Sequence, residues 1–219
     1  MAAKKQFMVI GLGSFGATVA GELVRLGHAV LGIDTDRRPV DALADVLTHA
    51  VVADGTDEKV LQELGADSFD TCVVAIGGNI EASSLVTLHL KALGAKKVWA
   101  QAATAAHKTI LTKIGADRVL IPEIEVGINI AQSLIYQGIM DYMALGDDSF
   151  VVEYRVAERF DTVAIEDLLG AHADAVRLLA VKRGRDFLDQ PLAGLALVKG
   201  DRLVLLGPRE ALEAVAAHL

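Results

Sequence analysis

The sequence predicts an α/β protein with a doubly wound, parallel, Rossmann-like sheet followed by a small α+β lobe. Short β-branched apolar runs alternate with helical patterns from residue 7 to about residue 122. These runs are nearly continuous rather than alternating with polar residues, which is typical of parallel strands covered on both faces. Several helical patterns end at a glycine, where helices commonly stop. Repeated βα units of this length imply right-handed crossovers and therefore a doubly wound sheet.

Six strands and five helices are expected in residues 1–122, which we assign to one Rossmann-like domain. The expected strands are Phe7–Ile10, Ala29–Ile33, Ala50–Ala53, Cys72–Ile76, Val98–Gln101 and Val119–Ile121. The expected helices are Phe15–Leu26, Val40–Leu47, Glu58–Leu64, Glu81–Leu93 and Ala106–Ile114.

A longer helix is expected after Pro122, over residues 123–143. Its apolar positions recur at helical spacing, and they are Val126, Ile130, Leu134, Ile135, Ile139 and Met143. Such a helix either packs on the finished sheet or crosses to another lobe or subunit, and the pattern favours neither. We assign residues 123–145 to a crossover segment that serves dimerisation if the second interpretation holds.

Residues 146–149, Gly-Asp-Asp-Ser, are interpreted as a boundary, because the pattern changes after them. Residues 146–219 are expected to form a small α+β lobe, with turns at Gly184 and Gly200. Its expected elements are strands at Phe150–Val156, Leu178–Lys182 and Arg202–Leu206, and helices at Ala164–Leu169 and Arg209–His218.

Composition and charge exclude several classes of protein. With 53% hydrophobic and 23% charged residues, the 219-residue chain is not disordered and has ample material for a core. It carries 21 Lys and Arg against 29 Asp and Glu, so nucleic acid is not an expected partner. No apolar run approaches the roughly 18–20 residues of a membrane span, and no signal peptide is recognisable. We expect a soluble, cytoplasmic protein in which the lone Cys72 is a small buried hydrophobe.

Residues 11–16, Gly-Leu-Gly-Ser-Phe-Gly, follow a predicted strand and open a predicted helix. In that context the first glycine allows a tight turn, the second lets a pyrophosphate approach the backbone, and the third lets helix and strand pack closely. Asp34 ends the second predicted strand about 20 residues on, where a carboxylate accepts hydrogen bonds from ribose hydroxyls. The pattern predicts a nucleotide site in which Asp34 disfavours the 2′-phosphate of NADP-type ligands.

Polar and glycine residues also follow the third and fourth predicted strands, as Asp54-Gly55 and Gly77-Gly78-Asn79. The carboxyl ends of parallel strands meet at one edge of a sheet, where open α/β sheets bind ligands. We therefore expect Asp54 beside the adenine or the ribose of the ligand.

The residue patterns of several enzyme classes are missing. The sequence has no G-x-x-x-x-G-K-S/T, which excludes a P-loop NTPase. None of the three tyrosines, Tyr136, Tyr142 and Tyr154, is followed four residues later by the lysine that some nicotinamide reductases use. The six histidines show neither H-x-x-x-H spacing nor a Cys/His cluster. A nucleotide fold without catalytic apparatus is expected, and an NAD-dependent oxidoreductase of Rossmann type is the alternative.

Several segments resemble the RCK family, the cytosolic regulatory subunits of Ktr- and Trk-type potassium uptake systems. They are residues 9–16, 75–79, 113–117 and 121–123, with 199–207 resembling the family's C-terminal ligand-binding lobe. The resemblance covers essentially the whole chain and is greatest to single-RCK subunits of the Ktr type.

This resemblance implies a partner and a ligand. Such subunits pair through the helix after the nucleotide domain and commonly assemble as an octameric ring. The ring lies beneath a membrane potassium translocator, at the inner face of the plasma membrane. Adenine nucleotide changes the transport rate by binding one ring conformation better than another. Some relatives also bind cyclic di-AMP between C-terminal lobes, which makes it a candidate second ligand.

Two positions depart from the family pattern. Ser14 stands where Ktr-type subunits usually carry an arginine that reaches phosphates across the dimer, and Gln101 stands where a lysine is expected. Both differences remove positive charge from around a triphosphate. Glu123 matches a family glutamate near the phosphates that helps bind a cation, so Mg²⁺ or Ca²⁺ is an expected companion.

The predicted function is a non-enzymatic regulatory subunit that binds ATP or ADP, with NAD as a further candidate, and controls potassium uptake. The predicted ligand-binding residues are Gly11, Gly13, Ser14, Phe15, Gly16, Asp34, Thr35, Asp54, Gly55, Ile76, Gly77, Asn79, Gln101 and Glu123. Glu123 is also the predicted metal ligand.

Overall fold

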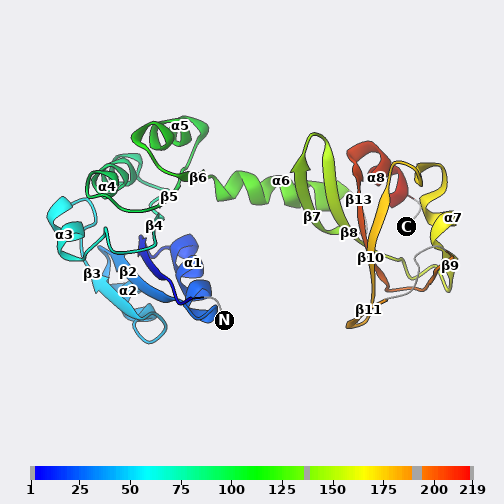
Figure 1. Ribbon diagram of the computed structural model, residues 1–219, viewed down its shortest axis with the longest axis horizontal. Helices are drawn as coiled ribbons and strands as arrows, with labels where there is room; N and C mark the ends of the chain where they lie inside the picture. Colours follow the sequence, from blue (N-terminus) through cyan, green and yellow to red (C-terminus); the bar gives the residue numbers. More distant parts are fainter. Residues whose placement is uncertain (1–2, 136–138, 189–193, 218–219) are drawn as a thin grey trace. The chain divides into compact units, whose positions relative to one another are not determined.

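The computed structural model describes residues 3–135, 139–188 and 194–217. The chain divides into two compact units, Met1–Pro122 and Glu123–Leu219 (Figure 1). Each unit has its own sheet and its own buried apolar core.

The first unit is built on a six-stranded parallel sheet with strand order β3-β2-β1-β4-β5-β6. Its strands are β1 (Gln6–Ile10), β2 (Ala29–Asp34), β3 (His49–Val52), β4 (Thr71–Val74), β5 (Val98–Gln101) and β6 (Arg118–Leu120). The connecting helices are α1 (Ser14–Arg25), α2 (Arg37–Leu43), α3 (Glu58–Glu63), α4 (Ile80–Ala92) and α5 (Ala105–Ile114). The order reverses between β1 and β4, as in doubly wound folds, so the predicted fold class is confirmed.

Both faces of this sheet are covered by helices, which explains the continuous apolar runs. On β1, Met8 and Ile10 face a core that α3, α4 and α5 close. Val9, between them, faces a second core formed with α1 and α2. Because successive strand residues point to opposite faces, a strand covered on both faces must be apolar at nearly every position.

The second unit begins with α6 (Pro122–Ile135) and contains a five-stranded antiparallel sheet with order β11-β10-β13-β8-β7. Its strands are β7 (Ile139–Gly146), β8 (Ser149–Arg155), β10 (Arg177–Arg183), β11 (Asp186–Phe187) and β13 (Arg202–Pro208), with a separate pair β9 (Val163–Ala164) and β12 (Ala196–Leu197). Its helices are α7 (Ile165–Leu169), the 3₁₀ turn Gly170–His172 and α8 (Arg209–Ala216). The predicted α+β lobe is confirmed, although the predicted end of its last helix, His218, lies outside the described residues.

The helix predicted over 123–143 is wrong beyond Ile135. Residues 136–138 lie outside the described part of the chain, and β7 follows. The boundary predicted at residues 146–149 is instead the turn that joins β7 to β8, with φ of 49° at Asp147 and 57° at Asp148. Two successive positive φ angles are typical of a type I′ hairpin turn. Pairing with β8, which places Met143 opposite Val151, therefore prevails over the helical spacing of the apolar residues.

A buried carboxylate ties together the strand ends of the second unit. Asp201, with 1% of its surface exposed, accepts hydrogen bonds from Arg183 Nε at 2.9 Å and Nη2 at 2.8 Å and from the N–H of Val198 at 3.0 Å. Burial by itself would raise the pKa of Asp201, but the hydrogen bonds from Arg183 and Val198 outweigh burial and the net shift is downward. Asp201 is therefore ionised and paired at neutral pH.

We expect Asp201→Asn to lower the free energy of unfolding by about 2 kcal/mol at pH 7, because the amide loses charge-assisted bonds from Arg183. The carboxylate stabilises above its unfolded-state pKa, and this stabilisation is lost as the pH falls through the lower folded-state pKa. The difference in the free energy of unfolding between Asp201→Asn and the wild type should therefore shrink as the pH falls. Urea unfolding followed by circular dichroism at several pH values measures both effects.

Glu153→Gln is the matched control, because Glu153 pairs with Arg202 at 3.2 Å and is more exposed than Asp201. Glu153→Gln should lower the free energy of unfolding by no more than about 0.5 kcal/mol. Equal losses in the two variants would contradict a special role for the buried pair.

Candidate nucleotide-binding site

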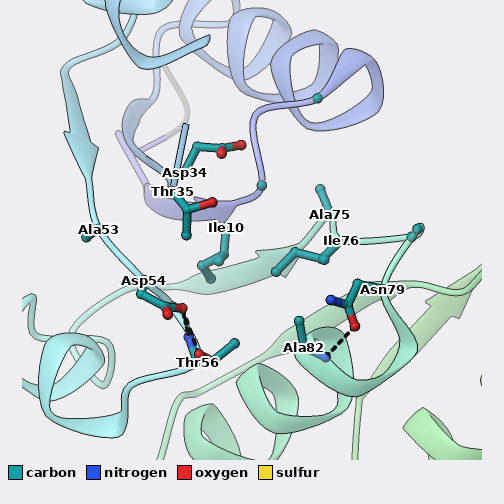
Figure 2. A pocket seen from close by; sticks show the side chains of 15 residues that line it. Ile10, Asp34, Thr35, Ala53, Asp54, Thr56, Ala75, Ile76, Asn79 and Ala82 are labelled. Atoms are coloured by element: carbon teal, nitrogen blue, oxygen red, sulfur yellow. Dashed lines mark hydrogen bonds between the residues drawn. The ribbon is translucent and has the colours of Figure 1, made fainter. Parts of the chain in front are cut away.

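A cavity of about 480 Å³ lies at the carboxyl ends of the strands of the first unit, where the strand order reverses between β1 and β4. Doubly wound sheets bind ligands at this place. Figure 2 shows side chains from the end of β2, from the segment after β3 and from the start of α4 around one hollow. The lining residues are Ile10, Gly11, Gly13, Asp34, Thr35, Ala53, Asp54, Gly55, Thr56, Ala75, Ile76, Gly77, Gly78, Asn79 and Ala82.

The glycines between β1 and α1 occupy positions where a side chain does not fit. Gly11 has φ of +93°, and a Cβ there would lie 2.7 Å from the carbonyl oxygen of Ala75. A Cβ on Gly16 would overlap the carbonyl oxygen of Gly11. Gly13 differs, because nothing lies within 4 Å of its would-be Cβ. Two glycines thus close the packing of loop, strand and helix, and the third faces open space that a phosphate can enter.

Helix α1 starts differently from the four helices that follow it. Side chains cap α2, α3, α4 and α5, each accepting a backbone N–H of the first turn, and these caps are Asp36, Asp57, Asn79 and Thr104. Helix α1 follows Gly13 with no side-chain cap and no acidic residue in its first turn. Its first N–H groups lack intrahelical partners, and the helix dipole adds positive potential there. This end of α1 is suited to an anionic group.

Asp34 holds the glycine loop as well as lining the cavity. Its Oδ2 accepts the N–H of Leu12 at 2.7 Å, and its Oδ1 accepts the N–H of Asp36 at 2.9 Å. A carboxylate oxygen can accept more than one hydrogen bond, so both oxygens keep capacity for ribose hydroxyls. Asp34 therefore connects the glycine loop after β1 with the end of β2 at the cavity.

Thr56 is a lining residue that the sequence analysis missed. Its hydroxyl donates to Asp54 Oδ1 at 2.7 Å and its N–H donates to the same oxygen at 2.9 Å. These two hydrogen bonds lower the pKa of Asp54. Asp54 is thus an ionised acceptor whose orientation Thr56 fixes. The signal for Thr56 was its place two residues after Asp54, as in an Asx turn.

The first turn of α4 completes the cavity. The Asn79 side chain accepts the N–H of Ala82 at 3.0 Å, and both residues line the hollow (Figure 2). Beneath this loop lies Gln101, which is 8% exposed, and a Cβ on Gly77 would come within 2.8 Å of its side chain. Gln101 therefore supports the loop from below rather than lining the cavity.

The structure brings nine of the fourteen predicted site residues together around the cavity, and these are Gly11, Gly13, Asp34, Thr35, Asp54, Gly55, Ile76, Gly77 and Asn79. Ser14, Phe15 and Gly16 form the first turn of α1 behind the loop. Glu123 belongs to the second unit, and neither it nor Gln101 is among the lining residues.

The cavity is acidic and carries no cationic side chain of its own. Asp34 and Asp54 face it, and none of the described lining residues is a lysine or arginine. Histidine, cysteine and tyrosine are also absent from these described lining residues, so Asp34 and Asp54 are the only ones among them that could act as a general acid or base. Phosphates placed here would rely on backbone N–H groups and on charge from outside the cavity.

Metal-binding clusters and membrane-spanning helices are both absent from residues 3–135, 139–188 and 194–217. Within them no three His, Cys, Asp or Glu side chains gather in a way that would hold a metal ion, and no helix is long and apolar enough to cross a membrane. Cys72 is fully buried, as predicted, and burial raises the pKa of its thiol to about 12.

Comparisons with known proteins agree with this architecture. The TrkA-N domain family matches residues 7–122. Ktr system potassium uptake protein A of Bacillus subtilis is 40% identical over 94% of this chain and 93% of its own length, and the corresponding protein C is 37% identical over 93% and 92%. The GsuK channel solved with NAD has the same fold, with a TM-score of 0.66 at 15% identity over 98% of this chain and 40% of that one. The chain therefore belongs to the RCK (TrkA-N) family, together with the Ktr system potassium uptake proteins.

Proposed function

We propose that this protein is a regulatory subunit that binds an adenine nucleotide and controls potassium uptake through a membrane translocator. The observation that carries the proposal is the uncapped start of α1 and Asp34 at one cavity, in a chain 40% identical to a Ktr potassium uptake protein. The named relatives are potassium uptake proteins, and in this proposal the cavity of the present chain serves as a nucleotide sensor.

The ligand is a nucleotide without a 2′-phosphate. Asp34 accepts ribose hydroxyls but repels a phosphate in the same position. ATP and ADP fit this requirement, and so does NAD, with which the related GsuK fold was solved. A hydride transfer to or from NAD would also need an acid–base group. Among the described lining residues only Asp34 and Asp54 could supply one, and both already accept hydrogen bonds from their own loops, which disfavours the oxidoreductase alternative.

A divalent cation suits the phosphate end of the proposed site. Mg²⁺ is commonly held by one or two carboxylates together with substrate phosphates, and Glu123 is the carboxylate that the resemblance to the family assigns to this role. The cation would neutralise the carboxylate and the phosphates, which the acidic cavity does not do itself.

The protein acts as an oligomer joined in part by α6. Large apolar side chains along α6 are about half exposed or more, namely Ile124, Val126, Ile128, Ile130 and Leu134. An apolar surface of this extent is unusual on a monomer and is typical of an interface. A second copy supplies a matching apolar helix, and further copies form the ring that acts on the translocator at the inner face of the membrane.

Asp34→Ala should weaken ATP and ADP binding by about one to two orders of magnitude, because a charge-assisted hydrogen bond is lost and the N–H of Leu12 loses its partner. Isothermal titration calorimetry measures this change. Asp45→Ala is the control, since Asp45 is exposed and does not line the cavity. Unchanged affinity in Asp34→Ala would show that the nucleotide binds elsewhere.

Without divalent metal, ATP and ADP should bind with similar affinity, because Ser14 and Gln101 offer no charge to the γ-phosphate. Adding Mg²⁺ or Ca²⁺ should shift the preference toward ATP, and Glu123→Gln should abolish that shift. Ser14→Arg should raise the metal-free ATP/ADP ratio by up to roughly tenfold, or about 1.4 kcal/mol. Calorimetry with and without chelator measures the ATP and ADP affinities of the wild type and of both variants.

A strong preference of the wild type for ATP in chelator would contradict this electrostatic account. So would a metal effect that survives in Glu123→Gln.

Light scattering at micromolar concentration should give a multiple of the 23.1 kDa chain mass. Ile128→Asp should lower that mass, because it places a charge in the apolar surface of α6. Leu26→Asp is the matched control, because Leu26 is also exposed, at 57%, but lies at the end of α1. A 23 kDa wild-type monomer, with and without nucleotide, would rule out the ring.

A further inference from the structure

His107 is a fully buried titratable residue that the proposed binding site does not use directly. It lies in the first turn of α5, where its N–H donates to Thr104 Oγ1, the cap of that helix, at 3.1 Å. Its ring fills the space between α5 and α4.

Both ring nitrogens of His107 have partners that fix its protonation state. The N–H of Ala103 points at Nδ1 at 3.1 Å, so Nδ1 is an acceptor and carries no proton. The single proton of the neutral ring is then on Nε2, which lies 2.8 Å from Ser83 Oγ. Ser83 Oγ accepts a hydrogen bond from this N–H and donates its own hydroxyl hydrogen to the carbonyl oxygen of Ile80 at 3.2 Å. The four groups form one directed chain that ends in the first turn of α4.

This chain connects two segments that shape the nucleotide cavity. Ser83 belongs to the turn of α4 that Asn79 caps, and Asn79 lines the cavity. Ala103 follows Gln101 by two residues, and Gln101 lies directly beneath Gly77. His107 therefore joins the start of α4 to the segment that supports the loop after β4.

We propose that His107 is a positioning residue for the nucleotide site, which holds its binding geometry only while the ring is neutral, so that protonation of the ring weakens nucleotide binding. The inference rests on the nucleotide binding proposed above and adds regulation by pH to it. A second proton on Nδ1 would face the N–H of Ala103, donor against donor, and the chain to Ser83 would have to rearrange.

The surroundings of His107 favour the neutral ring. Burial lowers its pKa. The charged and titratable groups on the elements packed against α5 are Glu81, His89 and Lys91 on α4, Asp117 and Arg118 at β6, and Lys108 and Lys113 on α5 itself. Lys91 pairs with Asp117 at 3.1 Å, and His89 lies 3.7 Å from Glu58. The ring nitrogens of His107 are hydrogen-bonded to the neutral groups of Ala103 and Ser83, and burial is the cause of its lowered pKa.

ADP titrations of the full chain at pH 7.5 and pH 5.5 test the proposal with His107→Gln, whose amide does not titrate. Between the two pH values the wild type should lose more affinity than this variant, by up to about fivefold, which is the full effect of one net hydrogen bond. His107→Gln should bind ADP about fivefold less well at pH 7.5, because the N–H of Ala103 loses its acceptor. The terminal phosphate of ADP also titrates in this range, but it does so equally with the wild type and with His107→Gln, so its effect cancels from the comparison of the two proteins.

His89→Gln is the matched control, since it makes the same substitution at another histidine, which lies on α4 and is not among the cavity residues. It should keep the wild-type pH dependence. The same pH dependence in His107→Gln as in the wild type would overturn the proposal.

Nitrogen-15 NMR of the wild type tests the proposal without any variant. At pH 7.5 the His107 ring should be neutral with its proton on Nε2, and saturating ADP should lower the midpoint of its protonation, because binding and protonation oppose each other. A proton on Nδ1, or a midpoint that ADP does not move, would overturn the inference while leaving the nucleotide site in place. Failure of the wild type to bind ADP at pH 7.5 would overturn the proposed function and this inference with it.

Discussion

The site depends on how closely the backbone after β1 approaches its neighbours. Gly11 lies against the carbonyl of Ala75, and Gly16 lies against the carbonyl of Gly11, at distances that leave no room for a Cβ. This packing brings the start of α1 to the point where the strand order reverses. Asp34 then fixes the loop through the N–H of Leu12. The peptide groups that face an anion are placed by sheet geometry and by two absent side chains, before any ligand arrives.

A cavity with two aspartates and no cationic side chain among its described lining residues does not balance the charge of a polyphosphate by itself. Backbone N–H groups contribute partial charges, and the remainder must come from a cation or from another copy of the chain. For the proposed regulator this has a consequence. If the nucleotide's negative charge is balanced by a cation or by a second copy of the chain, nucleotide binding becomes sensitive to the presence of either. Under this proposal, occupancy of the site would depend on metal and assembly as well as on nucleotide concentration.

The N-terminal sheet could be predicted from the sequence because its signals are local. Apolar runs and helix-ending glycines are short-range patterns, and every predicted strand lies within two residues of an observed one. Strand β7 could not be predicted in the same way. Its apolar residues continue the spacing of α6, and only pairing with β8, a contact between different segments, makes them a strand.

The side-chain network of the site was predictable only in part. Asp34 and Asp54 were found because the ends of parallel strands meet at one edge, which topology alone implies. Thr56, Gln101 and His107 act through contacts with Asp54, Gly77 and Ser83. The pairing of Thr56 with Asp54 has a local signal, its spacing of two residues, whereas the contacts of Gln101 and His107 join segments far apart in the sequence, and no spacing encodes them.

Recognition through peptide groups also affects how the sequence can change over evolution. The N–H groups at the start of α1 are present whatever side chain position 14 carries, and Ser14 is exposed. Substitution at that position therefore alters the charge near a ligand while the hydrogen-bond donors remain in place. Gly11 and Gly16 have no such latitude, because any side chain would displace the loop. Ligand preference can thus change by substitution at position 14 while the architecture proposed to hold the phosphates stays the same.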